Sequence, residues 1–360
     1  MSAESGRERT SAQFRPLSAS TLPLSRHQLD RDYLGRSATD LFASLRLDPR
    51  MRQLVLWNGL ALLDQSGALN LLPSHTELDS KLTLYLGRSA DPLVPKIGAM
   101  LAGQSAPADQ IDPVFPVGPA APTLPVVAVI VTDEVAQTLA PLESSAANHG
   151  TGSFWGDLRT LGKTFSDRDA GLFTAALALA NWHDSHRFSP RTGMATVAAQ
   201  GGWVRTDVET GGEVFPRTDS AVIVAVVDAD DRLLLGHNAM WPSNRYSLLA
   251  GFVEPGESLE NAAVREVFEE SGIRIIDPVY VGSQPWPFPA SLMVGFMARV
   301  NPQLESILTP DGKEILDLRW FSRDELFGSL EQISLPGHTS IARAMIENWY
   351  GSPISDRRQW

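Results

Sequence analysis

The chain of 360 residues has no cysteine, no long apolar run and no excess of positive charge. Without cysteine, neither a disulfide nor a thiolate-bound zinc ion can form. No stretch of about 18 apolar residues is present, which argues against a membrane-spanning helix. The formal charge is 30 − 42 = −12, so the chain has no general attraction for nucleic acid or anionic lipid. If it acts on phosphates, it must use local groups or bound cations.

The sequence also shows no targeting signal. The first residues, MSAESGRERTSAQFR, are polar and lack the apolar core of a secretory signal. The last residues, DRRQW, are not a peroxisomal tripeptide. Cytoplasm is therefore the expected location. Hydrophobic residues make up 43% and charged residues 20%, which is typical of a globular protein. A length of 360 residues is enough for two or three domains.

Residues 1–185 predict a β-rich domain with some helix. KLTLYLG at 81–87 and PVVAVIVT at 125–132 are short β-rich runs bounded by turn residues. A helix is predicted from Ser166 to Trp182, because it opens on a capping residue and is rich in good helix formers. A Pro- and Ala-rich loop is expected over 103–125. This half carries no motif for chemistry, so a scaffold or subunit-contact role is expected.

Residues 218–360 predict an α/β sandwich with a mixed sheet, preceded by a turn-rich segment at 186–217. The overall class is therefore mixed α/β (α+β). Strands are expected at 221–228, 232–236, 246–253, 277–282, 291–300 and 316–321, and helices at 258–271, 323–330 and 338–350.

The helix predicted at 258–271 carries three carboxylates on one face. Ser258 can cap it and Gly272 can end it. Glu266, Glu269 and Glu270 stand at i, i+3 and i+4, where like charges repel unless a cation compensates. A neighbouring apolar strip is formed by Leu259, Ala263 and Val267, and it is expected to dock the helix on the sheet. The carboxylates would then point outward into a cleft. Ligands made only of oxygen suit Mg²⁺ or Mn²⁺.

The full spacing from 251 to 273 resembles the box of the Nudix hydrolases, which split nucleoside diphosphates linked to a further group. Every fixed position of that box is filled: Gly251, Glu257, Arg265, Glu266, Val267, Glu269, Glu270, Gly272 and Ile273.

The resemblance implies a division of roles. Arg265 would pair with Glu257 and brace the loop against the helix. Either Glu269 or Glu270 would orient or deprotonate the attacking water, with Glu270 slightly favoured. The metal ligands implied are the Ala250 carbonyl, Glu266, Glu269, Glu270 and, from a later segment, Glu314.

The stretch SQPWPFPAS at 283–291 narrows the range of candidate substrates. Each of its prolines restricts the residue before it, so the segment can be neither helix nor ordinary central strand. The pattern resembles that of NADH pyrophosphatases of the NudC type, which cut NADH or NAD⁺ into AMP and nicotinamide mononucleotide. Rigid aromatic walls suit a dinucleotide because they lose little entropy on binding.

The same resemblance implies substrate contacts, while Trp286 and Phe288 stay open between base contact and structural packing. Ala342 would contact the substrate through its backbone. The full set implied is Phe215, Phe252, Gln284, Pro285, Trp286, Pro287, Phe288, Pro289, Ala290, Ser291 and Ala342.

The turn-rich segment at 186–217 departs from the family. SPRT at 189–192 and DVET at 207–210 stand where a zinc ribbon carries its two CxxC pairs. Serine, threonine and one aspartate cannot make a tetrahedral zinc site. No zinc is expected, and the segment must keep its shape by hydrogen bonds and packing.

The leading interpretation is an Mg²⁺- or Mn²⁺-dependent hydrolase of the NAD(H) pyrophosphate that also accepts NAD joined to the 5′ end of RNA. The alternatives are a Nudix hydrolase of another nucleoside diphosphate derivative, and a catalytically silent dinucleotide sensor. A silent sensor would typically have lost a box glutamate, and none is missing. The resemblance also implies a homodimer.

Overall fold

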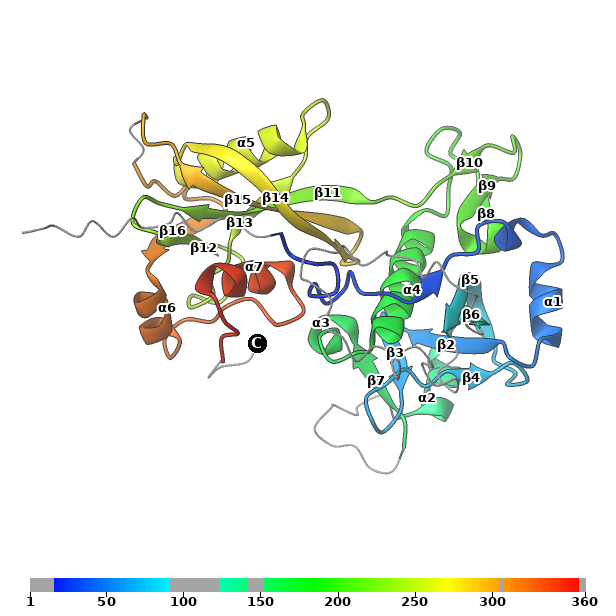
Figure 1. Cartoon of the computed structure of the whole chain (residues 1–360). Coiled ribbons are helices and arrows are strands. Elements are labelled where there is room, and N and C mark those ends of the chain that lie inside the picture. The colour runs from blue at the N-terminus through cyan, green and yellow to red at the C-terminus, as the bar shows by residue number, and fades with distance from the viewer. Residues whose placement is uncertain (1–15, 91–122, 142–151, 305–306, 356–360) are drawn as a thin grey trace, which may run out of the picture. The chain divides into compact units, whose positions relative to one another are not determined.

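The computed structural model describes residues 16–90, 123–141, 152–304 and 307–355, which form two compact units (Figure 1). The N-terminal unit contains residues 23–218 together with 285–291, and the C-terminal unit contains the remaining described residues. Residues 103–122 of the expected proline-rich loop lie outside the described ranges. The predicted three-domain division, with boundaries at 185 and 217, stays a prediction. No helix in the described ranges is long and apolar enough to cross a bilayer.

A mixed sheet forms the centre of the N-terminal unit, in the order β1-β5-β6-β2-β3-β7 with β4 beside β2. Helix α4 packs on one face, where Phe173 and Ala176 meet Leu56 and Leu84. Helices α1 and α2 pack on the other face. The elements are β1 (Leu29–Asp30), α1 (Leu41–Leu47), β2 (Arg52–Trp57), β3 (Leu60–Leu63), β4 (Leu72–Pro73), β5 (Ser80–Ala90), β6 (Thr123–Val131), α2 (Asp133–Leu139), β7 (Phe154–Asp157), α3 (Leu158–Leu161) and α4 (Asp167–Ser185).

A small antiparallel sheet follows in the same unit, in the order β10-β9-β8. Its strands are β8 (Thr196–Ala199), β9 (Val204–Asp207) and β10 (Glu213–Val214). Its Arg205 donates to His183 of α4 at 2.7 Å and to the Thr196 hydroxyl at 2.6 Å. The Thr196 contact joins β9 to β8, and the buried His183 contact ties the small sheet to α4.

The C-terminal unit is a sheet with helices on both faces, which confirms the predicted mixed α/β class. The strand order is β14-β15-β11-β12-β16, with β13 beside β11. Helix α5 covers one face, and α6 and α7 cover the other. The elements are β11 (Asp219–Val227), β12 (Leu233–Asn238), β13 (Leu249–Phe252), α5 (Leu259–Ser271), β14 (Ile275–Trp286), β15 (Ser291–Val300), β16 (Ile315–Phe321), α6 (Arg323–Ser329) and α7 (Ile341–Tyr350).

Two strand predictions need correction. The strand expected at 246–253 is shorter, because only Leu249–Phe252 pairs continuously as β13. The strand expected at 277–282 is longer, since β14 runs on to Trp286 through the first half of the proline-rich stretch. Prolines are tolerated there because β14 lies at the edge of the sheet, where a missing N–H costs no ladder hydrogen bond.

Candidate active site

Helix α5 has the boundaries that its sequence predicts. The Ser258 hydroxyl accepts a hydrogen bond from the Asn261 N–H at 3.2 Å. Gly272 ends the helix in the left-handed region, with φ of 70°. Ala263 and Val267 are fully buried against the sheet. The apolar strip therefore fixes the rotation of the helix and the position of its carboxylates.

Arg265 joins the loop that precedes α5 to the carboxylates of the helix. Its Nε and Nη2 donate to the two oxygens of Glu257 at 3.1 and 2.5 Å. Nη2 also donates to the Phe252 carbonyl at 3.0 Å. Nη1 donates to Glu266 at 2.9 Å and to Glu269 at 3.1 Å. A planar guanidinium is suited to such forked contacts, so Arg265 holds loop and helix as one unit.

Gly251 gives Glu266 the space it occupies. A Cβ atom at residue 251 would lie 2.1 Å from the Cδ of Glu266. No side chain fits there unless the Glu266 carboxylate moves. The glycine therefore lets strand β13 approach the acidic face of α5 closely.

Glu270 is buried, so the prediction that all three carboxylates point outward is wrong for this residue. Its exposed fraction is 5%, and its Oε2 atom has no hydrogen-bond partner among the described residues. Burial first, and then the negative charges of Glu314 and Glu266, together raise the pKa of Glu270 to about 8, against a lowering by the Ala250 N–H. A carboxylate held in this way needs either a proton or a cation.

Glu314 lies just before β16, and two residues that the sequence analysis missed surround it. Asp311 Oδ1 accepts hydrogen bonds from the Glu314 N–H at 3.1 Å and the Ile315 N–H at 2.8 Å. Asn238, at the end of β12, donates to Glu314 Oε1 at 3.2 Å. The Asp-Gly pair at 311–312 is a turn signal that could have indicated Asp311. Asn238 shows no such signal.

The donor chemistry of this cluster fits a hard divalent cation. The side chains offer only carboxylate oxygens, one of which is a buried atom without a partner. No group of three or more metal-binding side chains converges into a complete site within the described residues. Glu266 and Glu269 are instead engaged by Arg265. A cation would have to draw the carboxylates together.

The predicted substrate residues of the C-terminal unit differ in exposure. The Phe252 side chain beside the box is 58% exposed. Gln284 is fully buried and donates to the Thr339 carbonyl at 3.0 Å. Ala342 is also buried, and its N–H donates to the Ser340 hydroxyl at 3.1 Å. Of the three, Phe252 alone presents a large exposed surface to a ligand.

The tip of the β14–β15 hairpin belongs to the N-terminal unit. The rings of Trp286 and Phe288 meet edge to face at 4.9 Å and pack against that unit's core. The Arg159 guanidinium lies 4.4 Å from the Phe288 ring centroid. Asn181 donates to the Pro287 carbonyl at 2.9 Å. Both rings therefore contribute to packing, while ligand contact stays a prediction.

The other predicted substrate residues of this unit differ in exposure. Pro287 is buried, Ala290 and Ser291 are half-buried, and Pro285, Pro289 and Phe215 are exposed.

The four positions of the missing zinc ligands form a hydrogen-bonded cluster centred on Asp207. The Thr192 hydroxyl donates to Asp207 Oδ2. Asp207 Oδ1 accepts from the Thr210 N–H at 3.1 Å, and the Ser189 hydroxyl accepts from the Thr192 N–H at 3.4 Å. These contacts, led by the one from Thr192, lower the pKa of Asp207 to about 2. Hydrogen bonds thus occupy the place of a metal.

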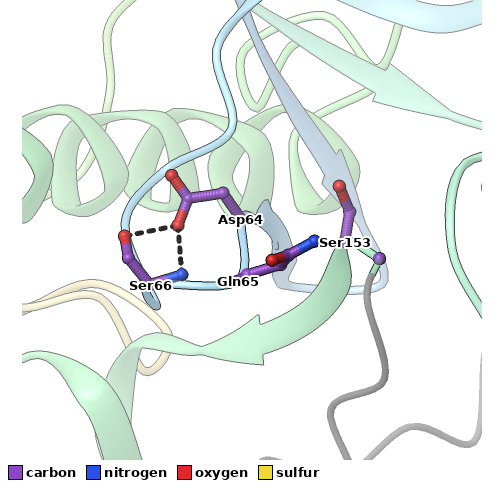
Figure 2. Close-up of a pocket in the computed structure, with 5 residues that line it drawn as sticks. Asp64, Gln65, Ser66 and Ser153 are labelled. Carbon is purple, nitrogen blue, oxygen red and sulfur yellow. Dashed lines mark hydrogen bonds between the residues drawn. The ribbon is translucent and has the colours of Figure 1, made fainter.

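A depression of about 450 Å³ lies elsewhere, in the N-terminal unit (Figure 2). Asp64, Gln65, Ser66, Gly152 and Ser153 line it. Asp64 Oδ1 accepts from the Ser66 N–H at 2.8 Å and from its hydroxyl at 2.6 Å, which closes a turn. None of the predicted site residues lines this depression.

Comparison with known proteins agrees with this geometry. Residues 216–345 match the NUDIX domain, so the chain contains a Nudix domain. A Mycobacterium bovis protein named NAD-capped RNA hydrolase NudC is 48% identical over 203 residues, which cover 54% of this chain and 64% of that protein. The human NAD-capped RNA hydrolase NUDT12 is 34% identical over 197 residues, which cover 51% of this chain and 42% of that protein. The chain thus spans less than two thirds of the length of these relatives.

Among solved structures, a NUDIX hydrolase from Nitrosomonas europaea covers 46% of this chain and 94% of its own, with 22% identity and a TM-score of 0.37.

Proposed function

We propose that this Nudix-domain chain hydrolyses the pyrophosphate of NAD(H) to AMP and nicotinamide mononucleotide, and that it also removes NAD from the 5′ end of RNA. The observation that carries this proposal is the acidic face of α5. There Arg265 engages Glu266 and Glu269, while Glu270 is buried with an oxygen that lacks a partner among the described residues. Such a face favours bound cations, and the divalent ions that accompany a pyrophosphate would supply the positive charge.

Nudix hydrolases generally use divalent metals, and we propose Mg²⁺ or Mn²⁺ for this chain. Glu266, Glu269, Glu270, Glu314 and the Ala250 carbonyl would hold the ions, which neutralise charge on the pyrophosphate oxygens. No zinc is expected, because Asp207 and its hydroxyl partners fill the ribbon positions.

The protein's own residues then act on water and substrate. Glu270, or in its place Glu269, takes a proton from the attacking water, whose oxygen bonds to one phosphorus. The bridging P–O bond breaks, and the second phosphate leaves with the electron pair. Arg265 stays outside the reaction and keeps Glu257 and Glu266 in position.

The aromatic residues support a dinucleotide substrate. Phe252 is exposed directly beside the box glycine and would stack on a base. The proline-aromatic stretch 283–291 and the names of the relatives favour NAD over other nucleoside diphosphates. We further propose that the chain works as a cytoplasmic homodimer and that residues 1–185, 186–217 and 218–360 are its domains.

The test is product identification. The purified protein is incubated with NADH and either Mg²⁺ or Mn²⁺, and the products are separated. AMP and reduced nicotinamide mononucleotide are expected, whereas nicotinamide and ADP-ribose would refute the proposed bond cleavage. Turnover of ADP-ribose or a nucleoside triphosphate in preference to NADH would favour the alternative Nudix substrates. The variant Glu270→Gln removes the proposed base and is tested in the same assay. Its matched control is Glu260→Gln, in the exposed first turn of α5.

A further inference from the structure

Asn238 ends strand β12 at a break in the strand pairing. Residues 233–237 pair regularly with β16, and the register shifts between His237 and Asn238. Such an irregularity redirects the side chain that follows it. Here the shift places Asn238 opposite Ile315, immediately after Glu314. The side chain of Asn238 thus reaches a residue that is distant in sequence.

The orientation of the Asn238 amide follows from its second contact. The Met240 N–H donates to Asn238 Oδ1 at 2.9 Å. A backbone N–H can only donate, so the atom facing it must be the amide oxygen. The amide nitrogen is therefore the atom that faces Glu314 Oε1, at 3.2 Å. Asn238 offers Glu314 a donor rather than a second acceptor.

The backbone on both sides of this contact is also held. The Ala239 N–H donates to the Glu314 carbonyl at 2.8 Å. On the other side, Asp311 Oδ1 accepts from the Glu314 N–H. The backbone of Glu314 is thus fixed from two directions, and Asn238 restrains its exposed carboxylate. One carboxylate oxygen is engaged by an uncharged donor, and the negative charge stays available to a cation.

We propose that Asn238 is a positioning residue that orients the Glu314 carboxylate toward the acidic face of α5 for divalent-metal binding. The proposal rests on the metal-dependent hydrolysis argued above. Ile315, the residue after Glu314, lies in the same buried apolar cluster as Ala263 and Val267 of α5, so β16 begins beside that helix. Groups that hold a metal-binding side chain in place commonly change metal affinity when they are replaced. Asn238 has this role toward Glu314 although it is 76 residues away in sequence.

Direct Mn²⁺ binding to the full-length protein tests this, with free Mn²⁺ followed by electron paramagnetic resonance without substrate. Asn238→Ser keeps an acceptor for the Met240 N–H but is too short to reach Glu314. Asn238→Asp keeps the shape and the acceptor but places a carboxylate against Glu314. We expect Asn238→Ser to weaken Mn²⁺ binding about 10-fold, and Asn238→Asp to weaken it at least as much. In a Glu314→Ala background, Asn238→Ser should cause no further loss.

Asn301→Ala is the matched control, because Asn301 Oδ1 accepts from the Gln303 N–H at 2.9 Å in the same kind of turn, without a contact to Glu314. It should bind Mn²⁺ like the wild type. Unchanged binding in both Asn238 variants would overturn the proposal, as would an equal loss in Asn301→Ala or a full further loss in the Glu314→Ala background. A wild type that binds no Mn²⁺ would overturn both proposals. A wild type whose Mn²⁺ binding depends on Asn238 as expected, but which leaves NADH intact, would refute only the proposed substrate.

Discussion

Replacing Glu270 by glutamine should stabilise the metal-free protein even though it removes the proposed base. Glu270 is 5% exposed, and its pKa is raised from the ordinary glutamate value of 4.5 to about 8, chiefly by burial. Between these two values the folded protein keeps a proton that the unfolded chain releases. The free energy of unfolding therefore falls as pH rises from 4.5 to 8. At pH 7 the loss of stability extends over 2.5 pH units above 4.5, which amounts to roughly 3 to 3.5 kcal/mol at about 1.4 kcal/mol per unit.

The assay is urea unfolding of wild type and Glu270→Gln in EDTA at pH 7 and at pH 5. Glutamine has the same shape and no charge, so the variant should be more stable at pH 7 by up to about 3.5 kcal/mol. At pH 5 the gain should fall below about 1 kcal/mol. Glu260→Gln should change stability by less than about 0.5 kcal/mol at either pH. A variant no more stable than wild type at pH 7, or a gain independent of pH, would refute the reasoning.

Two further predictions concern Gly251 and Asp207. Gly251→Ala should displace the Glu266 carboxylate, since a Cβ would lie 2.1 Å from its Cδ, and lower NADH hydrolysis about 10²-fold; a folded variant with full activity would contradict this. The lowered pKa of Asp207 stabilises the fold above pH 3.8, and this contribution is lost as the pH falls toward 2. Asp207→Asn should therefore be less stable than wild type near neutral pH. Its stability, followed by near-ultraviolet circular dichroism, should also fall less as the pH is lowered toward 2. A variant whose stability falls with pH as steeply as that of wild type would argue against the Asp207 cluster.

The sequence by itself determined the acidic helix and its place on an α/β sandwich. Ser258 and Gly272 act on the backbone next to them, and the 3.6-residue period sets which side chains share a face. Both effects operate within a few residues, so α5 could be predicted from the sequence. The strands of the C-terminal half could be predicted for the same reason, except for the ends of β13 and β14. The missing cysteines likewise predicted that hydrogen bonds and packing hold the segment at 186–217, although only the structure shows Asp207 at the centre of these bonds.

Only the tertiary structure decided which carboxylate is buried and what holds the others. Glu266, Glu269 and Glu270 look alike in sequence, yet the rotation of α5 on the sheet buries Glu270 and leaves Glu269 exposed. The contact between Asn238 and Glu314 depends on the pairing of β12 with β16, far apart along the chain. The packing of Trp286 and Phe288 likewise depends on a core built by residues before 186. Such contacts follow from long-range packing, which no local pattern encodes.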